Sequence, residues 1–262
     1  MNPVISLAQM NIEPGNLERN VATAFAMIED AAKRKSSVVL LPELWSSGYD
    51  LEQAEKHALE TPHILQTLSQ MATQHGIAIG GSLLENTGEG IYNTFYWVSP
   101  TEGIFSYRKI HLFRLMEEDR WLSPGDHLQM VSTELGKAGL AICYDLRFPE
   151  LFRRYALDGA TLFLLSAEWP LKRVHHWQTL LRARAIENLC FMFAVNCVGP
   201  AYKDVFGGTS AVLSPWGETL AEGSQTNEEL ITAQVDLSQL ERARSFLPIY
   251  QDRRPDVYRL SD

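Results

Sequence analysis

Three reactive side chains of different chemistry occupy the same kind of position in this sequence. Glu43, Lys109 and Cys143 each come just past a short run of residues that is typical of a β-strand. These runs span residues 38–42, 104–107 and 140–142. Since active sites of α/β sheets assemble at the carboxyl ends of strands, the three side chains are expected to meet. A carboxylate base, an ammonium that stabilises an oxyanion and a thiol nucleophile form a catalytic set that needs no metal or cofactor.

Cys143 has the clearest local signal of the three. An apolar run precedes it, and Pro149 with Glu150 indicates that a helix begins soon after it. Between a strand end and a helix start, backbone N–H groups and the helix dipole are expected to favour the thiolate. The alternative, a small buried core residue, fits Cys190 and Cys197 better, because both lie in apolar segments.

Other interpretations of these residues explain less of the sequence. Taken alone, Glu43 could cap the next segment and Lys109 could be an ordinary solvated lysine. A cysteine hydrolase using His111, His175 or His176 would leave both Glu43 and Lys109 without a role. A zinc site built from these histidines and a cysteine lacks recognisable ligand spacing.

The elements that must position these side chains alternate between strands and helices. Amphipathic helices are predicted over residues 17–32, 64–75, 149–157 and 177–189, and Gly76 ends the second of them. Strands are predicted over residues 4–10, 38–41, 77–83, 91–98, 103–108, 139–142, 161–166, 191–195, 210–214 and 229–235. Residues 111–126 are predicted to form a long loop, and the tail from Arg242 onward is only weakly periodic. The alternation favours an α/β fold, and the strand pair without an intervening helix argues against a purely parallel sheet.

Length, charge and cysteine content exclude several classes of protein. A chain of 262 residues without a flexible linker or repeat is interpreted as a single domain, residues 1–262. The formal net charge of −9 argues against binding to nucleic acid or to an anionic membrane surface. No apolar stretch is long enough to span a bilayer, and the first ten residues are interpreted as a strand rather than a signal peptide. Three cysteines do not suggest a disulfide framework, so a cytoplasmic location is expected.

Motifs along nearly the whole chain resemble the nitrilase superfamily, also called the carbon–nitrogen hydrolases. The matching segments cover residues 41–44, 47–49, 107–113, 142–151, 182–188 and 214–218, in the order found in that family. The resemblance implies a four-layer αββα sandwich that carries a Glu–Lys–Cys triad at Glu43, Lys109 and Cys143. It implies a second glutamate in the loop after the lysine, placed at Glu118 with Glu117 as its neighbour. It also implies that no metal and no organic cofactor takes part.

Within that superfamily, Cys143 to Glu150 resembles the branch that contains the omega-amidases. Those enzymes act on the terminal amide of 2-oxoglutaramate and 2-oxosuccinamate, so a small-molecule amide is the expected substrate. We expect the backbone N–H of Tyr144 to stabilise the oxyanion. The candidates for substrate contacts are two cations for the far carboxylate and two aromatic walls, namely Arg147, Arg173, Tyr49 and Trp169. Arg147 could instead pair with Asp145 or Glu150.

Two further expectations concern alternatives and assembly. A nitrilase or an N-carbamoyl amino acid hydrolase would use the same triad, and a non-catalytic binding protein could retain the same fold. The resemblance implies a homo-oligomer, with a dimer favoured. Its interface would involve residues 149–157 and the tail beyond about residue 240, whose apolar residues could equally pack on their own domain.

Overall fold

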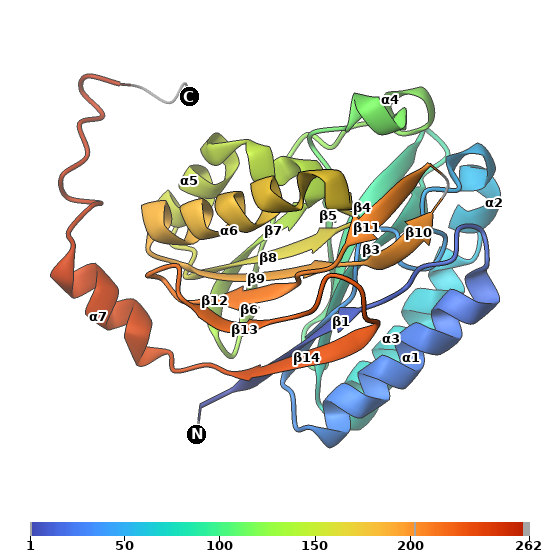
Figure 1. Cartoon of the computed structure of the whole chain (residues 1–262), viewed down its shortest axis with the longest axis horizontal. Coiled ribbons are helices and arrows are strands. Elements are labelled where there is room, and N and C mark those ends of the chain that lie inside the picture. Colours follow the sequence, from blue (N-terminus) through green and yellow to red (C-terminus); the bar gives the residue numbers. More distant parts are fainter. Residues whose placement is uncertain (1, 202, 259–262) are drawn as a thin grey trace.

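Two six-stranded sheets form the centre of the protein, which a computed structural model describes at residues 2–201 and 203–258 (Figure 1). The first sheet has the order β14-β1-β2-β3-β4-β5 and the second has the order β13-β12-β9-β8-β7-β6. The first contains β14 (Glu229–Gln234), β1 (Val4–Gln9), β2 (Val38–Leu40), β3 (Ala78–Asn86), β4 (Ile91–Ser99) and β5 (Gly103–Arg108). The second contains β13 (Thr219–Glu222), β12 (Ala211–Leu213), β9 (Phe191–Asn196), β8 (Leu162–Ala167), β7 (Gly136–Ile142) and β6 (Met130–Thr133). A small hairpin pairs β10 (Val198–Ala201) with β11 (Asp204–Gly207).

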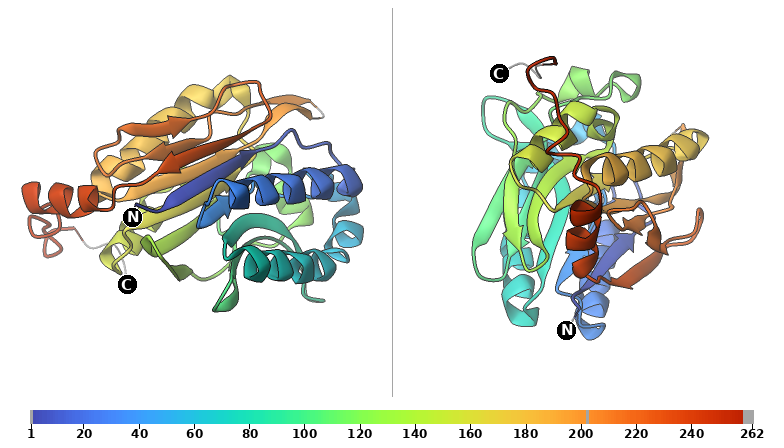
Figure 2. Two further views of the ribbon diagram at one scale, coloured as in Figure 1. Left: turned by 90° about the horizontal axis from the view of Figure 1, so that it is seen from below. Right: turned by 90° about the vertical axis from the view of Figure 1, so that its left-hand side faces the viewer.

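Helices cover the outer face of each sheet, which gives the predicted four-layer αββα sandwich (Figure 2). On the first sheet lie α1 (Leu17–Lys33) and α3 (Thr61–His75), and on the second lie α5 (Pro149–Leu157) and α6 (Val174–Asn188). The remaining helices are α2 (Ala54–Ala58), α4 (Glu118–Trp121) and α7 (Ser238–Phe246), with short 3₁₀ turns at residues 51–53, 114–116, 143–147 and 171–173. Among the described residues, no helix is long and apolar enough to cross a membrane.

The strand β2 illustrates why the central strands carry no polar alternation. Val38 and Leu40 point into the core between the two sheets, whereas Val39 and Leu41 pack on the other side with α1 and α3. Both faces of such a strand are buried, so an unbroken apolar run is what this position requires. The first polar side chain after this run, Glu43, is therefore placed at the end of a fully buried strand.

The three strands that precede the reactive side chains run toward these side chains, as predicted, so that each side chain follows the carboxyl end of its strand. In the first sheet β2 is parallel to β3, and two antiparallel steps through β4 make β5 run the same way. In the second sheet β7, β8 and β9 are mutually parallel. The carboxyl ends of β2, β5 and β7 thus carry Glu43, Lys109 and Cys143.

The short strands β6, β10, β11 and β13 and the short helix α2 were not predicted. Two longer segments also differ from the prediction. The segment 111–126 is not entirely a loop, because it contains a 3₁₀ turn at Arg114–Met116 and the short helix α4. The tail contains α7, which was predicted only as weakly periodic chain. Only Ala243 of α7 is fully buried, and Leu240 packs partly buried against the core, so the apolar face of this short helix is small.

Candidate active site

One buried ammonium group links two buried carboxylates at the edge where the sheets meet. Lys109 Nζ lies 2.7 Å from Glu43 Oε1 and 2.5 Å from Glu118 Oε1. All three side chains are 0 % exposed. Burial is costly for charged groups, and close pairing offsets that cost. The structure therefore brings together three of the four residues expected at the reaction centre.

Glu43 is fixed by hydrogen bonds to both of its carboxylate oxygens. Asn93 Nδ2 donates to Oε1 at 2.8 Å, and the backbone N–H of Glu168 donates to Oε2 at 2.9 Å. The next residue, Leu44, has a φ of +42°, and its N–H donates to Ser82 Oγ at 2.8 Å. This left-handed conformation is uncommon for a branched side chain, and it turns the backbone sharply just past the strand end.

Glu118 enters the cluster and its neighbour Glu117 does not. Tyr49 Oη donates to Glu118 Oε1 at 2.5 Å, and the N–H of Phe113 donates to Oε2 at 2.8 Å. Glu117 instead forms an exposed ion pair with Arg120. Tyr49, expected as a pocket wall, is thus a hydrogen-bond partner of Glu118.

The main chain around Lys109 is held on both sides. Its N–H donates to the carbonyl of Asn93, and its carbonyl accepts from the N–H of Gly125, each at 2.8 Å. A Cβ at residue 125 would lie 2.2 Å from the carbonyl oxygen of Arg108, so only glycine permits this approach. The segment around Gly125 thereby packs directly against the end of the strand that precedes the lysine.

Opposing effects set the pKa of Lys109 and of Glu118. Burial alone would lower the pKa of Lys109, but the charges of Glu118 and Glu43 outweigh it and the pKa is raised. Burial raises the pKa of Glu118, against the opposing charge of Lys109. The lysine is consequently held as a cation at neutral pH, where an oxyanion would need it.

Cys143 begins the turn Cys143–Arg147, between the end of β7 and the start of α5. Its φ is +42°, and its Sγ lies 3.8 Å from the carbonyl oxygen of Glu168. Burial, followed by the negative charge of Glu43, raises the pKa of the thiol well above its usual range. The sequence predicts a backbone that favours the thiolate, and in the folded protein desolvation of the buried thiol acts in the opposite direction and raises the pKa. The resting group is a thiol that must lose its proton to react.

A third buried carboxylate, Asp145, braces this turn against β5. It accepts hydrogen bonds from Tyr107 Oη at 2.8 Å, from the N–H of Ile142 at 2.9 Å and from the N–H of His111 at 3.1 Å. The ring Nδ1 of His111 lies 2.8 Å from Asp145 Oδ1. Since Tyr107 and His111 flank Lys109 by two residues on either side, Asp145 ties the lysine strand to the cysteine turn. Sequence reasoning missed this role, although the residue stands only two positions past Cys143.

Glu168, just past the end of β8, is a further buried carboxyl that sequence reasoning did not assign. The residue is 1 % exposed, and its Oε1 has no hydrogen-bond partner among the described residues. Burial, followed by the charge of Glu43, raises its pKa well above the usual range of a carboxyl. Its position at a strand end, like that of Glu43, is the signal that could have indicated it.

A narrow pocket opens onto Cys143. It is lined by Phe113, Cys143, Tyr144, Arg147, Glu168, Trp169, Pro170 and Arg173. The guanidinium of Arg147 lies 4.8 Å from the ring centroid of Trp169, and that of Arg173 lies 5.2 Å from the ring centroid of Phe113. Three of the four expected substrate contacts thus line this pocket, and Tyr49 does not.

Both arginines of the pocket lack an acidic partner. Asp145 is occupied by Tyr107 and His111, and no described carboxylate forms an ion pair with Arg147 or Arg173. The alternative that Arg147 pairs with Asp145 or Glu150 is therefore wrong. Burial and the nearby Arg173 lower the pKa of Arg147, which is the signature of a cation without a counter-charge.

The histidine alternatives receive no geometric support. Within residues 2–201 and 203–258, none of His111, His175 and His176 is hydrogen-bonded to Cys143. His111 stacks on Phe148 with ring centroids 3.5 Å apart, and His176 Nδ1 lies 3.3 Å from Arg147 Nη2. No group of three metal-binding side chains was found in the described part of the chain.

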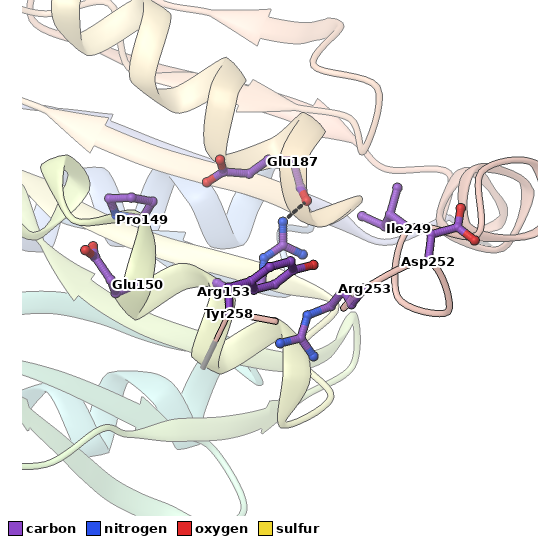
Figure 3. Close-up of a pocket in the computed structure, with 8 residues that line it drawn as sticks. All are labelled: Pro149, Glu150, Arg153, Glu187, Ile249, Asp252, Arg253 and Tyr258. Carbon is purple, nitrogen blue, oxygen red and sulfur yellow. Dashed lines mark hydrogen bonds between the residues drawn. The ribbon is translucent and has the colours of Figure 1, made fainter. Parts of the chain in front are cut away.

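A separate pocket of about 540 Å³ lies between α5, the end of α6 and the C-terminal segment (Figure 3). Its lining residues are Pro149, Glu150, Arg153, Glu187, Ile249, Asp252, Arg253 and Tyr258. None of them belongs to the lysine–carboxylate cluster. This pocket coincides with the two segments expected at a subunit interface.

Comparisons with known proteins agree with this geometry. The family model described as "Carbon-nitrogen hydrolase" matches residues 4–245. The chain is 40 % identical to the 2-oxoglutaramate amidase of Bacillus subtilis over 98 % of this chain and 100 % of that protein. It is 35 % identical to the human omega-amidase NIT2 over 91 % of each chain. A CN-hydrolase superfamily protein from Xanthomonas campestris, solved with an arsenic adduct in its active site, has a TM-score of 0.87 and 30 % identity over 97 % of this chain and 98 % of its own.

Proposed function

The chain belongs to the carbon–nitrogen hydrolase family, and on this premise we propose that it is an omega-amidase whose nucleophile is Cys143. It hydrolyses the terminal amide of a small 2-oxo dicarboxylic acid monoamide, with 2-oxoglutaramate as the first candidate. Relatives named for this activity support the proposal. The observation that carries it is the pair of arginines in the pocket of the buried thiol, neither of which has an acidic partner among the described residues.

The cluster supports a two-step reaction. Glu43 takes the Sγ proton as the sulfur attacks the amide carbon, and the carbonyl electron pair moves to oxygen. Lys109 and the backbone N–H of Tyr144 stabilise that oxyanion. When the C–N bond breaks, Glu43 returns the proton to nitrogen, so that ammonia leaves and a thioester remains on Cys143. Glu43 then takes a proton from water, whose oxygen attacks the thioester, and the acid leaves as the thiol reforms.

The arginines support a dicarboxylic-type substrate. Arg147 and Arg173 line the pocket of Cys143, and each lies against an aromatic ring. A carboxylate at the far end of the substrate would supply the missing negative charge between them, and charge-assisted hydrogen bonds to arginine are strong. Glu118, held against Lys109, keeps the lysine oriented and charged.

The test compares the purified protein with Cys143→Ala and Arg147→Met. Ammonia release is measured with 2-oxoglutaramate, propionamide, a simple aliphatic nitrile and an N-carbamoyl amino acid. We expect the wild-type protein to hydrolyse 2-oxoglutaramate and Cys143→Ala to be inactive. In Arg147→Met the KM for 2-oxoglutaramate should rise about 10- to 100-fold, because one charge-assisted contact is lost. Propionamide has no carboxylate, so its turnover should not respond to Arg147→Met.

Other results would change the assignment. Turnover of the nitrile or the carbamoyl compound alone would reject the substrate and keep the nucleophile. Activity retained in Cys143→Ala would reject the mechanism. If the wild-type protein turned over none of the four compounds, the result would favour a non-catalytic binding protein.

We propose further that the protein is a homodimer of single-domain subunits in the cytoplasm. All three cysteines are free thiols, which suits a reducing compartment. The segments 149–157 and 240–258 are the proposed interface, and both contribute to the pocket of Figure 3.

A further inference from the structure

Three buried carboxyl groups surround one buried cation in this site. Glu43 and Glu118 share the ammonium of Lys109, and Glu168 lies close enough to feel all three charges. A single positive charge cannot compensate three carboxylates in a region excluded from water. Glu168 makes no ion pair among the described residues, and burial, followed by the charge of Glu43, raises its pKa, which favours the neutral carboxylic acid.

The backbone of Glu168 is firmly placed while its carboxyl lacks a partner. Its N–H donates to Glu43 Oε2 at 2.9 Å, and its carbonyl oxygen lies 3.8 Å from Cys143 Sγ. The neighbouring N–H of Trp169 donates to Asn196 Oδ1 at 2.6 Å. The side-chain oxygen Oε1 is buried without any hydrogen bond among the described residues. An unsatisfied buried acceptor costs about 1–3 kcal/mol and calls for an explanation in function.

The carboxyl of Glu168 belongs both to the pocket of Cys143 and to the buried group of charges around Lys109. The charges of Glu43, Lys109 and Glu118 act on this carboxyl. Glu168 lines the same pocket as both arginines. A substrate whose carboxylate meets the arginines would therefore place its amide beside Cys143 and Glu168.

We propose that Glu168 is a specificity-determining residue that accepts a hydrogen bond from the carboxamide N–H of the substrate. This inference rests on the proposed amide hydrolysis at Cys143 and adds recognition of the nitrogen that leaves. A primary amide offers two N–H donors, whereas a nitrile offers none and an ester none at the leaving atom. A buried acceptor left unpaired by such analogues would disfavour their binding.

Neutrality of Glu168 suits this role. An ionised carboxylate there would add to the negative charge around Lys109 and would work against a thiol that must lose a proton. As an acid, Glu168 offers its carbonyl oxygen to the amide without changing the charge of the cluster. A glutamine has the same shape and keeps the acceptor oxygen, so it is the conservative replacement.

The experiment uses Glu168→Leu and Glu168→Gln with two alkylating probes. Iodoacetamide carries a primary carboxamide, and methyl iodoacetate of similar size carries no N–H. The rate of Cys143 labelling by each probe is followed by mass spectrometry, and the ratio of the two rates cancels changes in thiol reactivity. We expect the ratio to fall about 10- to 100-fold in Glu168→Leu and to recover in Glu168→Gln, the range for a lost hydrogen bond in a buried site.

Steady-state kinetics with 2-oxoglutaramate are the second measurement. We expect kcat/KM to fall in Glu168→Leu and Glu168→Gln to restore most of it, while the melting temperature of Glu168→Leu does not fall. An unchanged labelling ratio in Glu168→Leu would overturn the proposal. So would a Gln variant as impaired as the Leu variant, which would mean that the negative charge is required. A changed ratio without any turnover of 2-oxoglutaramate would reject the proposed substrate and keep the role of Glu168.

Discussion

At the scale of single residues, burial decides the chemistry more than sequence neighbours do. Cys143 has the strand-end position expected of a nucleophile, yet desolvation makes it a thiol with a raised pKa. Lys109, equally buried, keeps its charge because two carboxylates lie within 2.7 Å of its Nζ. A nucleophile that rests as a thiol needs a base beside it, and the negative charge of Glu43 acts on this thiol. Replacing Glu43 should therefore affect the reactivity of the Cys143 thiol and the turnover of substrate differently.

We predict that Glu43→Gln abolishes most turnover while Cys143 remains open to alkylation. Glu43 raises the pKa of the thiol, so its replacement by a neutral amide lowers that pKa and leaves Lys109 to favour the thiolate. Turnover also needs a proton for ammonia and a base for water, which glutamine cannot provide. The expected loss in kcat is about 10²- to 10⁴-fold, the usual contribution of a general base.

The measurement pairs steady-state ammonia release with the rate of Cys143 labelling by iodoacetamide. Asn93→Ala is the matched control, because it removes a hydrogen bond to Glu43 Oε1 and leaves the carboxylate in place. If labelling of Glu43→Gln were lost in parallel with turnover, Glu43 would act only by holding the site together.

At the scale of elements, the site depends on the junction between β5 and the turn after β7. The two segments belong to different sheets, and Asp145 joins them through the hydrogen bonds to Tyr107, His111 and the backbone of Ile142. The left-handed φ of Cys143 adds local strain, which persists only where surrounding contacts enforce it. Asp145 is the contact placed to do so.

We predict that Asp145→Ala lowers the free energy of unfolding by about 3 kcal/mol, because it leaves buried donors on Tyr107 and Ile142 without acceptors. The lysine strand and the cysteine turn would then shift relative to one another. A displacement near 1 Å at a reaction centre costs about 10²-fold in rate, so kcat should fall by a similar factor. Urea unfolding and ammonia release measure the two effects.

Tyr107→Phe is the control for this prediction. It removes one donor and keeps the ring in the core, and the expected cost is about 1 kcal/mol. Equal losses in the two variants would show that Asp145 acts on Tyr107 alone and does not brace the turn.

At the scale of the whole molecule, the sequence predicted the buried central strands best. Runs such as residues 38–41 and 161–166 are apolar because both faces of their strands are covered, so the sandwich and the strand-end residues could be recognised. Helix α7 was not recognised, because its apolar face is short and consists mainly of the buried Ala243 and the partly buried Leu240. The roles of Asp145 and Glu168 depend on contacts between segments that are far apart in the sequence, and local pattern carries no such information. Tyr49 was expected as a pocket wall, and its hydrogen bond to Glu118 also depends on segments that are far apart in the sequence.

The C-terminal segment leaves apolar side chains uncovered in the single chain. Figures 1 and 2 show α7 and the following residues projecting from the body of the sandwich. Phe246, Val257 and Tyr258 are 79 %, 69 % and 50 % exposed. Tyr258 lines the pocket of Figure 3, and exposed apolar groups in one segment are typical of an interaction surface. A dimer axis would bring two copies of this segment together.

We predict that Phe246→Asp combined with Val257→Asp converts a dimer into a monomer. Both side chains are mostly exposed in one subunit, so the charges should cost the isolated fold little while they prevent burial between subunits. Sedimentation velocity measures the mass of wild type and variant. Leu59→Asp is the matched control, because Leu59 is 72 % exposed and lies between α2 and α3, in a different part of the molecule. A dimer that survives in the double variant, or that dissociates in Leu59→Asp, would place the interface elsewhere, and a monomeric wild type would leave these residues exposed for another partner.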